Sequence, residues 1–259
     1  MSALSTIQVV PTPLVHYVVR RADDALILGH RLSEWTGKAP ILEEEMALAN
    51  MALDLIGQAR SLYSYAGAVE GAGHDEDDFA YLRRERDYRN LLLVERPNGD
   101  FAHTILRQFF YAAYADPYWR AMMQSADATL AAIAAKAEKE MAYHLRHSAE
   151  WVLRLGDGTA ESHRRVADAL AELWPFTGEM FLADAEEQAL IGEGIAIDPA
   201  GLRATWDATV GEILQAAMLE VPKGGFMQQG GRQGRHSEHF GHLLTELQYI
   251  QRLVPGASW

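Results

Sequence analysis

The sequence predicts an all-α fold, a four-helix bundle with additional helices at its C-terminal end, and two observations carry this prediction. The helix-forming residues Ala, Leu, Glu and Arg dominate the composition, and no regular alternation of Val, Ile and Thr appears. Apolar residues recur at helical spacing over long stretches, first from Leu14 to Trp35 and again over residues 41–68. Short connections between such helices predict antiparallel neighbours in an up-down bundle. Because no repeat or break in composition is visible, residues 1–259 are expected to form one domain.

Proline, glycine and capping residues set the expected ends of the helices. Gly37 ends the first helix and Pro40 opens the second, while Asp127 caps the fourth and Gly156 follows it as a C′ glycine. Pro117 marks the end of the third helix or a kink in it. The expected helices are residues 14–35, 40–68, 79–89, 101–114, 128–155, a segment on either side of 174–175, 198–220 and 237–254. Irregular structure is expected in a loose N-terminal arm, residues 1–13, and a flexible loop, residues 222–236.

Charge and cysteine content exclude several classes of function. The formal charge of −13 argues against nucleic acid or an anionic membrane as the main partner, although a local basic patch remains. That patch comprises Arg83, Arg84, Arg86 and Arg89. The chain has no cysteine, which rules out disulfides, iron–sulfur clusters and thiol catalysis. The N-terminal residues do not resemble a signal peptide, and no apolar run is long enough to span a membrane, so a cytoplasmic protein is expected.

Two polar stripes interrupt the apolar pattern of the second and fourth long helices. Each stripe has polar residues at four-residue steps, so its members share one helix face. The stripes are Asn50, Asp54 and Gln58 on one helix, and Lys136, Glu140 and His144 on the other, with Tyr143 and His147 alongside. Facing each other inside a bundle, they would form a buried polar centre, which is costly unless its charges are paired or bound to metal.

A di-iron carboxylate site would require a Glu from each of two helices and Glu-x-x-His from each of the other two. Here Gly57 and Tyr143 stand three residues after the two candidate carboxylates, Asp54 and Glu140. The third helix offers His103, Arg107 and Gln108 where a Glu would be needed, and the carboxylates elsewhere are Glu34, Glu45 and Asp24. The interpretation favoured by the residues is a hydrogen-bonded structural network, in which Lys136 and Arg107 supply the positive charge.

Two further motifs are weaker. The segment GGRQG at 230–234 matches no phosphate-binding loop and is expected to be flexible. His236, His239 and His242 recur at three-residue steps near Glu238, which is compatible with adventitious metal binding but more typical of an exposed helix start.

Several long stretches resemble the C subunits of bacterial phenylacetyl-CoA 1,2-epoxidases, which are multicomponent monooxygenases of phenylacetate catabolism. These stretches are RLSEWTGKAP, ALANMALDLIGQAR, NLLLVERPNGDFA, KEMAYHLRHSAEWVLRLGDGT, LWPFTGEMF and HLLTELQYIQRLVPG. The resemblance implies a ferritin-like fold and a complex in which a related A subunit carries the di-iron centre. It also implies an NADPH-dependent reductase that supplies electrons, and a C subunit that pairs with the A subunit and supports it.

Carried over by position, the family's di-iron ligand pattern is incomplete in this chain. Gly57 and Tyr143 occupy the two places where His is expected, and Asp54, Glu140 and His144 are interpreted as remnants. The resemblance therefore implies a structural subunit without catalytic residues, metal or other cofactor of its own. The large apolar faces of the first two helices, Leu14–Trp35 and Ile41–Ala68, are expected to dock against its partner. Two alternatives stay open: an active di-iron oxidase or iron-binding ferritin-like protein, and a ligand-binding module whose 222–234 loop closes over CoA.

Overall fold

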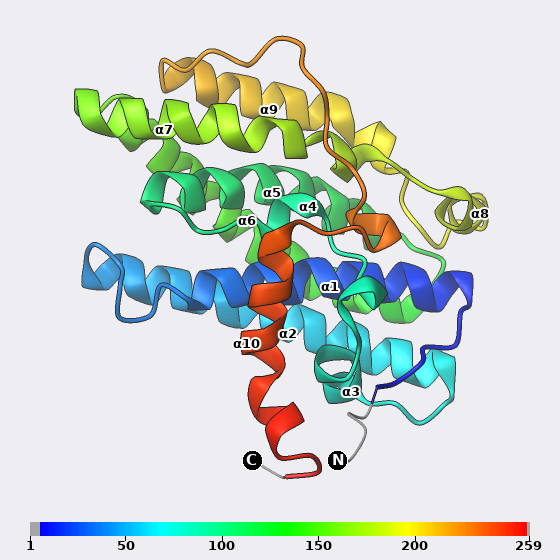
Figure 1. Ribbon diagram of the computed structural model, residues 1–259. Coiled ribbons are helices and arrows are strands. Elements are labelled where there is room, and N and C mark those ends of the chain that lie inside the picture. Colours follow the sequence, from blue (N-terminus) through cyan, green and yellow to red (C-terminus); the bar gives the residue numbers. More distant parts are fainter. Residues whose placement is uncertain (1–5, 258–259) are drawn as a thin grey trace.

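Four long helices form the main bundle in the computed structural model, which describes residues 6–257 (Figure 1). They are α1 Pro13–Ser33, α2 Leu42–Glu70, α5 Phe101–Met122 and α6 Ala128–Gly156. Helix α1 packs along α2, α5 packs along α6, and α2 also contacts α6. Residues 6–257 form no β-strand, which confirms the predicted all-α class.

Shorter helices cover the bundle on two sides. They are α3 Glu76–Tyr81, α4 Leu92–Glu95, α7 Ala160–Leu173, α8 Ala185–Gly192, α9 Arg203–Ala216 and α10 Glu238–Leu253. Helices α7 and α9 form a further layer against α5 and α6, whereas α10 crosses the direction of the bundle and contacts α3 and α4 (Figure 1). The additional C-terminal helices predicted from the sequence are therefore present. None of the described helices is long and apolar enough to cross a membrane.

The connection between α2 and α5, residues 71–100, makes the predicted up-down topology wrong. Phe101 at the start of α5 packs edge-on against Trp35, just beyond the end of α1, with ring centroids 5.9 Å apart. Near the other ends of the same two helices, the Tyr17 and Tyr118 hydroxyls lie 2.5 Å apart. Helix α5 therefore runs antiparallel to α1 and parallel to α2, so the connection must return along the bundle. One long crossover of this kind is the arrangement of ferritin-like bundles.

Two helix boundaries differ from the prediction for local reasons. Pro117 lies inside α5, which continues to Met122, because a proline removes only one backbone donor and the tightly packed neighbours hold the helix together. The helix expected at 79–89 begins earlier, since the Asp75 side chain accepts hydrogen bonds from two backbone N–H groups of the first turn. It ends at Tyr81 and is followed by a single 3₁₀ turn, η1 Glu85–Asp87.

Gly156 is the last residue of α6 rather than a C′ glycine, and its φ is not positive. Its role is close packing: a Cβ at this position would lie 2.3 Å from the carbonyl oxygen of Ala217, at the end of α9. Because backbone atoms cannot yield like a flexible side chain, Gly156→Ala is expected to lower the free energy of unfolding by about 1–3 kcal/mol. Urea denaturation measures this change.

The control for this substitution is Gly211→Ala, in the middle of α9. A Cβ there meets nothing within 4 Å, and alanine is the better helix former, so the control should be neutral or slightly stabilising. Equal losses of stability in the two variants would contradict the packing role assigned to Gly156.

The described part of the N-terminal arm, residues 6–12, lies against the crossover. The backbone N–H of Ile7 donates to the Leu82 carbonyl at 3.1 Å, and that of Val10 donates to the Glu70 carboxylate at 2.6 Å. Thr12 then caps α1 by accepting from the Val15 N–H. Residues 1–5 of the predicted loose arm lie outside the described residues.

Candidate functional site

The two polar stripes face each other along the seam between α2 and α6. His144 lies between both neighbouring helices: its Nε2 is 3.1 Å from Asp54 Oδ2, and its Nδ1 is 3.1 Å from Gln108 Nε2 on α5. One turn away along α6, Glu140 accepts a hydrogen bond of 2.8 Å from Gln58 Nε2 and lies 3.4 Å from Lys136 Nζ. The four-residue spacing therefore brings together the residues that it singled out.

This seam opens to solvent, so the prediction of a buried polar centre is only partly correct. His144 and Gln58 are buried, but the side chain of Asp54 is 35% exposed and that of Lys136 is 67% exposed. Asn50 is also exposed. Among the described helices, α7 and α9 contact α6 but have no comparable contact with α2. Periodicity shows which residues share a face, but not whether another helix covers that face.

The donors at the seam do not fit a di-metal centre. Among residues 6–257, no group of three or more Asp, Glu and His side chains is placed to hold a metal ion. Asp54 is engaged by His144, and Glu140 is engaged by Gln58 and Lys136.

The two positions where His would be expected are filled differently. A Cβ added to Gly57 would lie 3.7 Å from Lys136 Nζ, so the ammonium group approaches the place of the absent side chain. The ring of the exposed Tyr143 lies beside the His147 ring, with centroids 5.9 Å apart. His147 Nε2 in turn lies 3.0 Å from Glu44 Oε2. Most of these polar groups bond one another, as in a structural network, while Gln58 Oε1, Gln108 Oε1 and His147 Nδ1 are buried without a hydrogen-bond partner among the described residues.

Arg107 lies outside the seam, so the prediction that it contributes charge there is wrong. Its guanidinium is fully buried and donates to the Arg96 carbonyl and to Asn98 Oδ1 near the start of α5. Burial, followed by the nearby Arg31 cation, lowers the pKa of Arg107 to about 9. These hydrogen bonds hold the end of the crossover against the start of α5, so the role of Arg107 is structural.

Two of the other polar candidates are engaged by contacts within the chain. His103 lies 2.9 Å from Glu172, and Glu34 pairs with Arg31. Glu45 is half-buried near the start of α2.

The three C-terminal histidines do not converge. His236 is buried and lies 2.7 Å from Glu95 Oε2 and 3.1 Å from the Tyr88 carbonyl. His239 is partly exposed, with its Nε2 3.9 Å from Glu238 Oε1, and His242 is exposed. His236 therefore anchors the segment before α10.

Sequence reasoning missed a set of buried ion pairs centred on α1. Asp23, completely buried, accepts from Arg83 Nη2 at 2.5 Å, from the Tyr63 hydroxyl at 2.5 Å and from the Arg89 backbone N–H at 2.7 Å. Its neighbour Asp24 accepts from the Leu91 N–H at 2.8 Å. These two carboxylates fasten the returning crossover to the middle of α1.

Segments from the C-terminal half of the chain are fastened to α1 in the same way. Arg232, on the predicted flexible loop, donates to Asp24 at 2.7 Å. Arg20 and Arg21 both donate to the buried Glu187 of α8, at 3.1 and 2.5 Å. Sequence offered one signal for this network: the charged residues Arg20, Arg21, Asp23 and Asp24 lie close together in an otherwise apolar helix.

Two buried glutamates complete the network by binding backbone donors. Glu179 accepts from the N–H groups of Leu92 at 2.9 Å and Gly230 at 2.8 Å. Glu95 accepts from the Ser237 N–H at 2.6 Å. Both carboxylates therefore hold the end of the 222–236 loop against the crossover.

A four-helix bundle with one long crossover, and with carboxylates and a histidine on facing helices, defines a ferritin-like protein. The family model of the phenylacetic acid catabolic proteins matches residues 3–259, and the chain belongs to this family. It is 50% identical over 246 residues to the C subunit of the 1,2-phenylacetyl-CoA epoxidase of Escherichia coli K12, covering 95% of this chain and 99% of that protein. The predicted resemblance is confirmed.

A solved structure supports the fold. Protein 19 with aldehyde deformylating oxidase activity, from Synechococcus, superposes with a TM-score of 0.54 at 18% identity, over 81% of this chain and 94% of that one. At this identity the likeness establishes the ferritin-like fold alone.

Proposed function

We propose that this chain is a structural, non-catalytic subunit of a cytoplasmic phenylacetyl-CoA epoxidase complex in aerobic phenylacetate degradation. Its partner is the A subunit that carries the di-iron centre, and an NADPH-dependent reductase supplies the electrons. The chain itself holds no cofactor. The observation that carries the proposal is the α2/α6 seam, where Asp54 and Glu140 are engaged by His144, Gln58 and Lys136. The identity with the C subunit of an epoxidase supports the same assignment.

A surface suited to this partner lies on α2, beside the seam. Its outward face carries four exposed apolar side chains at positions 42, 46, 53 and 56, a spacing of four, seven and three residues that makes one helical stripe. They are Leu42 (69% exposed), Met46 (60%), Leu53 (66%) and Ile56 (39%). Exposed apolar stripes of this kind mark protein interfaces. We therefore propose that α2 docks against the di-iron subunit.

Helix α1 is a poor second docking element, contrary to the sequence-based prediction. Every residue from Tyr17 to Gly29 is buried within the chain, under α2, α4 and α8. Its apolar faces are therefore already covered, and the contribution of α1 to a complex is to stiffen the subunit. A stiff neighbour holds metal ligands of the partner in place.

Metal analysis and reconstitution together test the proposed function. The purified chain is expected to contain nearly no iron, and the complex is expected to lose activity when either this chain or the di-iron subunit is omitted. In the assembled complex, Asp54→Asn with Glu140→Gln should leave the turnover per complex unchanged, because these carboxylates bind no catalytic metal. Arg164→Gln, on the exposed surface of α7, serves as the matched control.

The opposite outcomes are equally clear. About two irons per chain, lost in the Asp54→Asn, Glu140→Gln variant together with activity, would overturn the proposal in favour of an active di-iron oxidase. Full activity of the complex without this chain would overturn it as well.

A further inference from the structure

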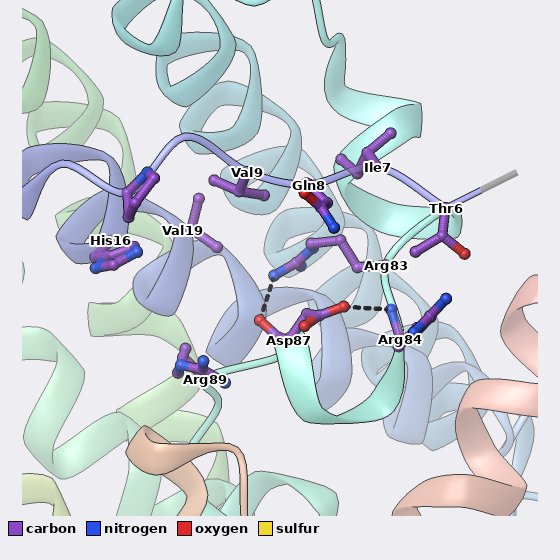
Figure 2. A pocket seen from close by; sticks show the side chains of 11 residues that line it. Thr6, Ile7, Gln8, Val9, His16, Val19, Arg83, Arg84, Asp87 and Arg89 are labelled. Carbon is purple, nitrogen blue, oxygen red and sulfur yellow. Dashed lines mark hydrogen bonds between the residues drawn. The ribbon is translucent and has the colours of Figure 1, made fainter.

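A pocket of about 490 Å³ lies between the N-terminal arm and the η1 turn, and none of its lining residues belongs to the α2/α6 seam (Figure 2). The arm forms one wall and η1, with the residues on either side of it, forms the other. A volume of this size is within the range of small-molecule sites.

The η1 wall is basic, in a chain whose formal charge is −13. Of its three arginines, Arg83 is neutralised by Asp23 at 2.5 Å. Arg84 and Arg89 have no carboxylate partner among residues 6–257. Figure 2 shows them at the two ends of the turn, with Asp87 between them.

The guanidinium groups of these two arginines differ in exposure. Arg84 is exposed, whereas Arg89 is half-buried and its Nη1 donates only to the backbone carbonyls of Arg86 and Tyr88. Burial lowers the pKa of the Arg89 guanidinium, and the Asp23 and Asp87 carboxylates nearby only partly offset this effect. An anion bound in the pocket beside either guanidinium would form charge-assisted hydrogen bonds with it.

With a phosphate beside the arginines, the remaining lining groups suit the sugar and the base of a nucleotide. The apolar side chains of Val9 and Val19 flank the pocket, and the Gln8 amide lies between the arm and η1 (Figure 2). Asp87 Oδ2 accepts from the Arg84 N–H at 3.0 Å, and its carboxylate retains capacity to accept from a hydroxyl or amino group. His16, at the edge, is engaged by Glu186 at 2.8 Å.

We propose that this pocket binds a phosphorylated adenosine, with Arg84 and Arg89 each contacting one of its phosphate groups and the valines packing against the base. Two kinds of ligand contain this group: a free adenine nucleotide, and CoA, which has a phosphorylated adenosine at one end. The lining residues, from Thr6 to Arg89, all belong to this chain, so binding is tested without the di-iron subunit and independently of the proposed function.

Isothermal titration of the full-length chain with ADP, CoA and inorganic phosphate tests the proposal. ADP or CoA is expected to bind, with an affinity that falls as salt is added. Arg84→Gln and Arg89→Gln should each raise the dissociation constant about tenfold, since each removes a charge-assisted bond. The matched control is Arg86→Gln, because Arg86 belongs to the same turn but does not line the pocket, and the carbonyl that Arg89 uses is retained.

The three titrants separate the outcomes. At least tenfold tighter binding of CoA than of ADP assigns the site to the CoA end, and equal binding of the two assigns it to a free nucleotide. Absence of binding by both overturns the proposal, as does inorganic phosphate binding as tightly as ADP. Equal weakening by Arg86→Gln and Arg84→Gln also overturns it. Arg84 is exposed, so its variant keeps the test valid even if Arg89→Gln fails to fold.

Discussion

Asp23→Ala is expected to lower the free energy of unfolding by about 3–5 kcal/mol, because it leaves the Arg83 guanidinium buried without its counter-charge. Arg83 and Asp23 are both completely buried, and Asp23 also accepts from Tyr63 and from the Arg89 backbone. Removing the carboxylate therefore deprives the Arg83 guanidinium, the Tyr63 hydroxyl and the Arg89 backbone N–H of an acceptor. Urea denaturation followed by circular dichroism measures the loss.

Two comparison variants separate burial from charge. Asp168→Ala breaks an exposed pair with Arg164 on α7 and is expected to change stability by at most about 1 kcal/mol. Replacing both partners, as Asp23→Leu with Arg83→Met, should recover much of the stability lost in Asp23→Ala, because no unpaired charge remains. A loss in Asp23→Ala no greater than that in Asp168→Ala would contradict the role assigned to this pair.

Leu53→Glu combined with Met46→Glu is expected to weaken association with the di-iron subunit by at least about a hundredfold, if α2 docks as proposed. Both side chains are more than half exposed in the isolated chain, so the substitutions should leave its stability almost unchanged. In the complex, however, they would place two carboxylates within an apolar contact. Co-expression with the partner followed by size-exclusion chromatography gives the readout.

A suitable control is Leu182→Glu, which alters another exposed apolar residue (50%) just before α8. It should leave co-elution intact. Retention of the complex by the Leu53, Met46 double variant would show that another face of the subunit docks, without affecting the assignment of the α2/α6 seam.

The long helices could be predicted from sequence because each has an apolar period and a local end signal, such as Asp127 before α6 and Gly71 after α2. The topology could not be predicted, since residues 71–100 contain only short helices whose path depends on distant contacts. Gly156 shows the same limit. Its place beside an expected helix end predicted a C′ glycine, but its role is set by Ala217 on another helix.

The residues of the seam could be predicted because both stripes are local, four-residue patterns on long helices. The exposure of the seam could not be predicted, because it depends on which helices cover α2. The ion pairs around α1 were beyond sequence reasoning for a related reason: Asp24 was seen only as a stray carboxylate, and its partner Arg232 lies 208 positions away.

The distance in sequence between these partners affects how the chain folds as it is made. Helix α1 leaves the ribosome well before its partners, because Arg20 and Arg21 pair with Glu187, and Asp24 pairs with Arg232. Until those partners are synthesised, the charged middle of α1 must stay hydrated, so this helix cannot be buried early. Such dependence on contacts between distant residues slows folding. A chain that stops before residue 232 would keep α1 accessible to chaperones and proteases, and full burial of its first helix would mark a completed subunit.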